Sequence, residues 1–236
     1  MTARERVIVA LDFASLAEAQ AMAALLAGRV GMFKVGLELL MCEGPQAVTQ
    51  IVATGTPVFV DCKLHDIPNT VAGAAAALAR HGCAMFNVHA TAGFEALRAA
   101  RQASEQAAAD AGKRRPLVIG VTILTSLDHS DLAALGISGS PAERVVALAL
   151  LCQRAGLDGV VASPLEAPAI KEACGRQFLV VSPGIRPALA GLGDQKRAMT
   201  PRDAVAAGAD YLVIGRPVTG ADDPVQAVER IVAEIG

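Results

Sequence analysis

The stretch PVFVDCKLHDIPNT, residues 57–70, begins as an apolar run and ends in polar residues around a proline. Side chains alternate along a strand, so Phe59, Asp61 and Lys63 share one face and the apolar residues between them share the other. Asp66 then falls in a loop, and Pro68 suits the first turn of a helix. The apolar face is expected to meet helices, which turns Asp61 and Lys63 toward the interior of the fold.

Similar Val/Ile/Leu-rich runs recur along the chain and predict eight strands. They cover residues 7–13, 32–37, 57–64, 83–90, 117–124, 159–164, 178–185 and 211–218. Alanine-rich stretches with helical spacing lie between them, for example Val71, Ala74, Ala75, Leu78 and Ala79. Continuous apolar strands alternating with helices predict an α/β fold, a (β/α)8 TIM barrel forming one domain over residues 1–236. A doubly wound open sheet is the alternative, although no Gly-x-Gly-x-x-Gly follows the first strand to support a dinucleotide site.

Composition excludes several classes of partner. A formal charge of -2 with no extended run of Lys or Arg argues against nucleic acid as a ligand. Asp12 interrupts the opening apolar run, so no secretory signal is expected, and no run reaches membrane-spanning length. The five cysteines form no C-x-x-C pair and read as reduced thiols, which predicts a cytoplasmic protein. They are Cys42, Cys62, Cys83, Cys152 and Cys174.

Polar residues collect where the predicted strands end, as they do in barrels that place catalytic groups at the carboxyl ends of strands. They are Asp12, Asp61, Lys63, His89, Thr125, Ser126 and Arg216, which follows Gly215, together with Lys34 within the second strand. Asp61 and Lys63 alone could form a structural ion pair. Adding Lys34 and Asp12 favours a functional cluster, because each buried ion costs several kcal/mol unless it is paired.

The alternating signs of this cluster constrain its chemistry. A lysine between carboxylates is held protonated, whereas a Schiff-base lysine needs a free amine. A divalent metal would have to share the carboxylates with two ammonium groups. Lys63 is therefore expected to donate a proton, with no metal. Gly215 and Arg216 predict a phosphate site after the last strand, closed by residues 182–197, SPGIRPALAGLGDQKR, for which a plain surface loop is the alternative.

Nearly the whole chain resembles the orotidine 5'-monophosphate decarboxylase family. DCKLHDIPNT resembles its signature Asp-x-Lys-x-x-Asp-Ile-x-x-Thr, and the other blocks follow in the family's order. Those blocks are ALDF, FKVGLEL, NVHATAG, VTILTSL, SPGIRP, GDQKR and VIGRPVT. Sugar-phosphate decarboxylases and synthases on a related barrel share the Asp-x-Lys-x-x-Asp element, whereas DIPNT and GDQKR favour the nucleotide enzyme.

The resemblance implies cofactor-free decarboxylation of orotidine 5'-monophosphate to uridine 5'-monophosphate, the last step of pyrimidine nucleotide synthesis. It implies a catalytic network of Lys34, Asp61, Lys63 and Asp66, in which Lys63 delivers a proton to C6 of the pyrimidine as carbon dioxide leaves. Asp66 and Thr70 would come from the neighbouring subunit of a homodimer.

The resemblance also implies which residues bind the substrate. Asp12 and Lys34 would hold the ribose, and Ser126 with the backbone near Thr125 would hold the pyrimidine edge. The phosphate would be held by Gln195, Gly215 and Arg216, with Arg186 in the closing loop. His65 and His89 are expected to be packed or supporting histidines.

Two other functions stay open at this point. One is a metal-dependent sugar-phosphate decarboxylase or synthase on the same barrel. The other is a catalytically silent sensor of phosphorylated ligands, against which the intact set of Lys34, Asp61, Lys63 and Asp66 argues.

Overall fold

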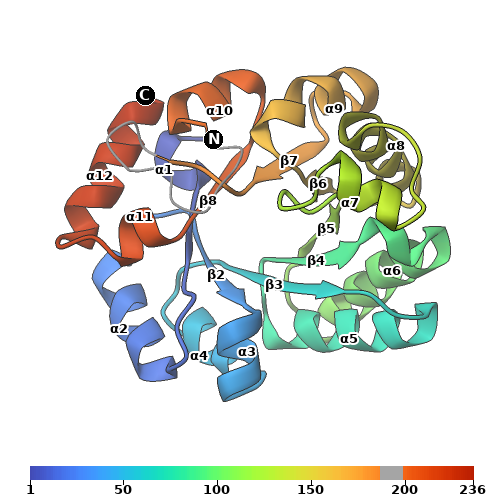
Figure 1. The fold of residues 1–236 in the computed structure, drawn as a ribbon. Coiled ribbons are helices and arrows are strands. Elements are labelled where there is room, and N and C mark those ends of the chain that lie inside the picture. Colours follow the sequence, from blue (N-terminus) through green and yellow to red (C-terminus); the bar gives the residue numbers. More distant parts are fainter. Residues whose placement is uncertain (187–198) are drawn as a thin grey trace.

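Strands of a single parallel sheet close into a barrel in the computed structural model, which describes residues 1–186 and 199–236 (Figure 1). The strands are β1 (Val7–Ala10), β2 (Met32–Gly36), β3 (Val58–Leu64), β4 (Met85–His89), β5 (Leu117–Val121), β6 (Gly159–Val161), β7 (Leu179–Ser182) and β8 (Tyr211–Ile214). Closure comes from parallel pairing of β1 with β8, in which Val7 is opposite Leu212. The predicted (β/α)8 barrel is confirmed, and the doubly wound alternative is wrong.

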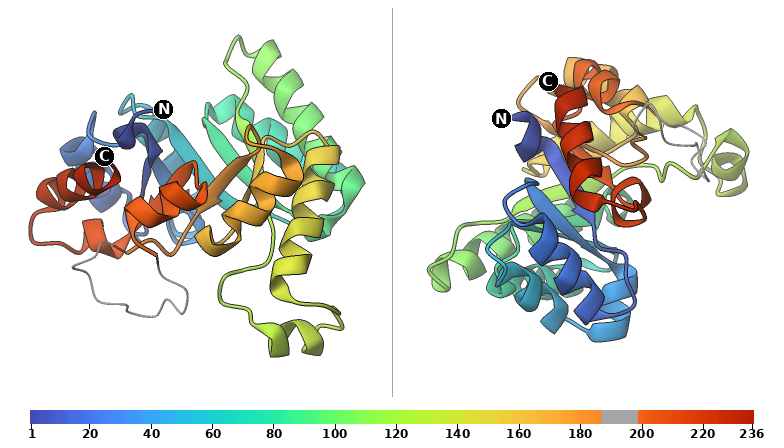
Figure 2. Two further views of the ribbon diagram at one scale, coloured as in Figure 1. Left: turned by 90° about the horizontal axis from the view of Figure 1, so that it is seen from above. Right: turned by 90° about the vertical axis from the view of Figure 1, so that its left-hand side faces the viewer.

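Helices surround the barrel, and the first of them, α1, packs beside the last, so that the two chain ends lie close together (Figures 1 and 2). The α-helices are α1 (Ala3–Arg6), α2 (Leu16–Leu26), α3 (Leu37–Glu43), α4 (Gln46–Val52), α5 (Pro68–His81), α6 (Phe94–Asp110), α7 (His129–Ala134), α8 (Pro141–Arg154), α9 (Ala167–Cys174), α10 (Pro201–Ala207), α11 (Arg216–Thr219) and α12 (Pro224–Ile235). Two 3-10 turns, η1 (Ala90–Ala92) and η2 (Pro164–Glu166), precede α6 and α9. Within the described ranges, no helix is both long and apolar enough to cross a bilayer.

The strands are apolar on both faces because one face meets the helices and the other fills the barrel. Inward-facing side chains form an apolar floor inside the barrel. It consists of Ile8, Met32, Phe59, Met85, Ile119 and Val181. Above this floor, toward the carboxyl ends of the strands, Lys34, Asp61 and Lys63 replace apolar residues. Strands β1 and β8 end before the predicted runs 7–13 and 211–218 do, so Asp12 and Gly215 lie in the loops that follow these two strands.

Helix α5 begins as the sequence predicts. Pro68 is its first residue, and Gly82 ends it in the left-handed conformation that glycine adopts without strain. Its face with Val71, Ala75 and Ala79 is buried. This helix therefore fixes the loop that connects it to β3, and that loop carries Asp66.

Two aspartates tie strands together at the amino-terminal end of the barrel. Asp158 precedes β6, accepts a hydrogen bond from the backbone of Val118 at 2.8 Å and pairs with both guanidinium nitrogens of Arg115 at 2.7 Å. Asp210 precedes β8 and accepts from Lys171 at 2.6 Å and from the backbone of Val180 at 2.8 Å. Each carboxylate thus joins its own strand to the strand before it.

We expect Asp158→Ala to lower the free energy of unfolding by about 2–3 kcal/mol, because it removes hydrogen bonds to a charged group and leaves a partly buried guanidinium without its partner. Urea titration followed by circular dichroism measures this. The control is Glu229→Ala, which removes an exposed ion pair with Arg29 and should cost less than about 1 kcal/mol. Equal losses in the two variants would contradict the role of Asp158.

Candidate active site

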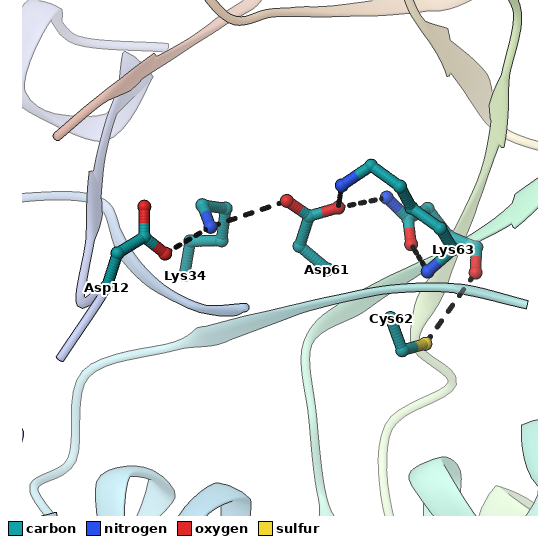
Figure 3. A network of polar contacts seen from close by, with 6 residues as sticks. Asp12, Lys34, Asp61, Cys62 and Lys63 are labelled. Carbon is teal, nitrogen blue, oxygen red and sulfur yellow. Dashed lines mark hydrogen bonds and ion pairs between the residues drawn. The ribbon is translucent and has the colours of Figure 1, made fainter. Parts of the chain in front are cut away.

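A chain of ion pairs crosses the carboxyl end of the barrel (Figure 3). The Lys34 ammonium lies 2.8 Å from Asp12 Oδ1 and 3.3 Å from Asp61 Oδ2. The Lys63 ammonium lies 2.7 Å from Asp61 Oδ1. Two cations and two carboxylates therefore alternate in sequence as predicted, with Asp61 between the two lysines.

Strand register explains why these side chains meet. Ala10 is opposite Lys34 in the β1–β2 pair, and Gly36 is opposite Asp61 in the β2–β3 pair. Gly36 also keeps open the space that the ion pair occupies: a Cβ there would lie 2.7 Å from Lys34 Nζ and 2.8 Å from Asp12 Oδ1. Any side chain at position 36 would displace the Lys34–Asp12 pair.

Asn87 is a site residue that the sequence interpretation missed. It is fully buried on β4, donates from Nδ2 to Asp61 Oδ1 at 2.7 Å and accepts from the backbone N–H of Lys63 at 2.7 Å. Its signal is its parity: Asn87 lies on the same face of the strand as Met85 and His89 and so faces inward. Asn87 therefore holds the Asp61 carboxylate and the backbone of Lys63 in place. The Lys63 ammonium pairs with the same carboxylate.

The end of β3 departs from regular strand geometry. Val60 is opposite Phe86, but Leu64 is opposite Val88, so β3 has an irregularity between these pairs. Lys63 has a φ of 49°, the only positive value for a non-glycine residue within the described ranges. A left-handed backbone is unfavourable for a lysine, and its presence at a polar cluster is typical of a functional site.

Charge overcomes burial at Asp61. Burial raises the pKa of this carboxyl. The ammonium groups of Lys34 and Lys63, together with hydrogen bonds from Lys63 and Asn87, lower it by more, so the pKa lies below its ordinary value. The group is thus a stable carboxylate at neutral pH. Lys34 is buried, whereas the Lys63 side chain is 31% exposed, so Lys63 is the more accessible of these two ammonium groups.

Among the described residues, two adjoining cavities of about 290 and 210 Å³ open at this end and share Asp61, Pro183 and Val213. The larger cavity is cationic and the smaller is mostly apolar. The cationic half includes Asp12, Lys34, Arg186, Gly215 and Arg216. The apolar half includes Phe59, Val121, Ile123, Val161 and Val181, with Lys63, Thr125 and Ser126 as its polar members. Asp61 stands at the junction.

The predicted site residues are thus mostly brought together. Asp12, Lys34, Asp61, Lys63, Thr125, Ser126, Arg186, Gly215 and Arg216 all line the two cavities. Gln195 lies outside the described residues, as does most of the predicted closing loop.

Asp66 and Thr70 are placed elsewhere. Both are exposed at the entrance of α5, and Asp66 Oδ1 accepts from the backbone of Ile67 at 2.6 Å. Neither lines the two cavities. In one chain, the predicted network of four charged residues is therefore a network of three joined by Asp12.

The two histidines next to the site contact each other. The His65 and His89 rings meet edge to face with centroids 5.4 Å apart, and His65 Nε2 lies 3.3 Å from Thr91 Oγ1. Burial, the neighbouring His65 ring and the Lys63 ammonium lower the pKa of His89. His89 is partly buried as expected, but His65 is exposed, because it lies in the loop beyond β3.

Within residues 1–186 and 199–236, no three His, Cys, Asp or Glu side chains gather in a way that could hold a metal ion. The carboxylates of the site are instead held by lysine ammonium groups and the Asn87 amide. The prediction that no metal takes part stays a prediction.

The closed barrel and the ionic network at its carboxyl end define a (β/α)8-barrel enzyme with a divided site. The chain belongs to the orotidine 5'-phosphate decarboxylase / HUMPS family, whose model matches residues 5–231.

Individual relatives match this chain over nearly its full length. An orotidine 5'-phosphate decarboxylase of Moorella thermoacetica is 52% identical over 236 residues, which is 100% of this chain and 94% of that protein. The protein of the same name in Halorhodospira halophila is 53% identical over 98% of this chain and 95% of its own length. The crystal structure of orotidine 5'-phosphate decarboxylase from Lactobacillus acidophilus matches with a TM-score of 0.86 and 36% identity, covering 98% of both chains.

The left-handed backbone of Lys63 can be measured as strain. Lys63→Gly and Lys63→Ala both remove the ammonium group, but only glycine adopts φ of 49° without strain. We expect Lys63→Gly to be more stable than Lys63→Ala by about 1 kcal/mol in urea titrations.

The neighbouring residue provides the control. Cys62 has no positive φ, so Cys62→Gly should be less stable than Cys62→Ala by about 0.5–1 kcal/mol. If glycine is also the worse residue at position 63, the backbone there is not strained.

Proposed function

We propose that the protein decarboxylates orotidine 5'-monophosphate to uridine 5'-monophosphate without a cofactor. The observation that carries the proposal is the Lys63 ammonium, held 2.7 Å from Asp61 where a cationic cavity meets an apolar one. The relatives that carry this name support it.

The divided cleft fits the two ends of such a substrate. The cationic half, with Arg186, Gly215 and Arg216, suits a phosphate, and Gln195 would join them. The apolar half suits a flat pyrimidine ring whose polar edge meets Ser126 and the backbone near Thr125. Asp12 and Lys34, in the cationic half, would hold the ribose hydroxyls between the two.

The chemistry follows from the charges at the junction. The bond from C6 to the carboxylate carbon breaks, carbon dioxide leaves, and the electron pair stays on C6. The ammonium of Lys63 stabilises this charge and gives C6 a proton, and the resulting amine regains its proton from solvent. Charge fixed in advance stabilises a developing anion without reorganisation, and Lys34, Asp61 and Asn87 fix the position of Lys63.

Asp61 has a second role in this proposal. Its ionised carboxylate would face the carboxylate of the substrate, and this repulsion is relieved as carbon dioxide departs. Binding of the remote phosphate supplies the free energy that holds the two like charges together.

We further propose that residues 1–236 act as one catalytic domain within a homodimer whose sites are shared. The support is the exposure of Asp66 and Thr70 beside Ile67, an apolar residue that is 66% exposed. An isologous contact would carry Asp66 and Thr70 into the site of the neighbouring chain.

The cysteines are all free, which fits a reducing cytoplasm.

The first test is decarboxylation by protein treated with EDTA, followed through the ultraviolet absorbance of orotidine 5'-monophosphate. We expect full activity with EDTA and loss of nearly all activity in Lys63→Ala, because no other ammonium among the described residues lines the apolar half of the cleft. Lys113→Ala, an exposed lysine at the opposite end of the barrel, is the matched control and should retain activity.

Other results would support other functions. Activity that EDTA abolishes and magnesium restores would identify a metal-dependent sugar-phosphate enzyme of the same barrel. Tight binding of the nucleotide without turnover would identify a sensor.

The second test is complementation between inactive variants. Lys63→Ala and Asp66→Ala homodimers should each be nearly inactive, but a mixed dimer contains one site with both residues intact. With random re-pairing, about half the dimers are mixed and about a quarter of the parental activity should return. If re-pairing is verified by mass spectrometry and activity stays absent, Lys63 and Asp66 serve a site from the same chain.

A further inference from the structure

A third cavity lies at the opposite, amino-terminal end of the barrel. Its volume is about 640 Å³, larger than either cavity of the candidate active site and within the usual range for small-molecule sites. The loop between α6 and β5 and the first residues of β3 and β8 line it, including Thr56, Val58, Lys113, Arg114, Arg115, Leu117 and Tyr211. No proposed catalytic residue is among them.

The charge of this lining has one sign. Lys113, Arg114 and Arg115 follow one another in the chain, and no carboxylate lines the cavity among the described residues. Arg115 is engaged by Asp158, and Lys113 donates to the backbone oxygen of Arg80 at 2.6 Å while keeping its charge. Arg114 makes no hydrogen bond or ion pair with any other described residue.

The carboxylates near this end of the barrel already have hydrogen-bond or ion-pair partners. The two whose charges raise the pKa of Tyr211 are Asp210 and Glu5. Asp210 binds Lys171 at 2.6 Å, and Glu5 accepts a hydrogen bond from the backbone of Thr2 at 2.7 Å. An incoming anion would therefore be the natural partner of Arg114.

Hydroxyl groups and an apolar wall complete the cavity. Thr56 is buried yet polar, and Tyr211 offers a phenol half-buried beside Arg114. Met32, Val52, Val58 and Leu117 supply apolar surface, together with Cys83, whose thiol pKa burial raises to about 12. A ligand here would combine an anionic group with an apolar one.

We propose that this amino-terminal cavity binds a small organic phosphate, a phosphate monoester with an apolar substituent. A phosphate is favoured over a carboxylate because it has more acceptor oxygens for the guanidinium, ammonium and hydroxyl donors that line this cavity. The site shares no lining residue with the proposed decarboxylation site.

The sequence provides a reporter for this cavity. The chain has one tyrosine and no tryptophan, so tyrosine emission comes from Tyr211 alone. Hexyl phosphate, which does not absorb in this range, is the probe, and hexanoate and hexanol test the contributions of the phosphate and of the chain. Decarboxylation is measured on the same preparations, so that failure of one proposal is distinguishable from failure of the other.

We expect a saturable change of Tyr211 emission with hexyl phosphate and clearly weaker binding of hexanoate and hexanol. Arg114→Ala should weaken hexyl phosphate binding about tenfold or more, as expected for loss of a charged hydrogen-bonding partner. Arg154→Ala, an exposed arginine at the end of α8 that does not line the cavity, is the matched control and should change binding less than about twofold. Arg216→Ala should leave the titration unchanged.

Three results would overturn the proposal. The first is absence of saturable binding to Arg216→Ala protein by both fluorescence and calorimetry. The second is equal weakening by Arg154→Ala and Arg114→Ala, which would indicate general charge attraction. The third is binding of hexanoate or hexanol as tight as that of hexyl phosphate, which would remove the role of the phosphate.

Discussion

The carboxylate of Asp61 is the group on which the geometry of the candidate active site depends. It receives Lys63 and Asn87 at 2.7 Å and Lys34 at 3.3 Å, from three neighbouring strands. Three donors around one anion repay the desolvation that each charge would otherwise suffer. Without that anion, two ammonium groups would face each other at the mouth of an apolar barrel.

The barrel keeps its stabilising and its reactive parts in separate layers. An apolar floor that includes Phe59 and Met85 fills the middle, and the ions of the candidate active site lie above it. At the opposite end, Asp158 and Asp210 join neighbouring strands through their own ion pairs. The carboxyl end can therefore carry like charges and a left-handed lysine because other parts of the fold supply the stability.

Much of the site could be predicted from the sequence because its residues obey a simple parity. Asp61 and Lys63 fall on the face opposite the apolar residues of β3, and the alternation of strand and helix places them at one end of a barrel. Asn87 follows the same parity but is neutral, and a lone amide gives no charge pattern to notice. The irregularity in β3 depends on pairing with β4, which one strand's sequence does not contain.

Other features depend on contacts that a strand pattern cannot express. The role proposed for Asp66 and Thr70 needs a second chain, and Gln195 lies outside the described residues. The short run Lys113–Arg115 predicts no binding site by itself in a chain whose overall charge is near neutral. Only the fold shows that these residues line one cavity with Thr56 and Tyr211, from distant parts of the chain.

Gly36 shows how far constraint on a residue can differ from participation in chemistry. It offers no functional group, yet a Cβ at this position would occupy the space of the Lys34 ammonium and the Asp12 carboxylate. A substitution at this position should therefore disturb the Lys34–Asp12 pair, although it removes neither charge. A survey that ranks positions by intolerance to substitution would place this glycine among the reactive groups. The residues that take part in the chemistry have to be identified instead by the functional groups they carry.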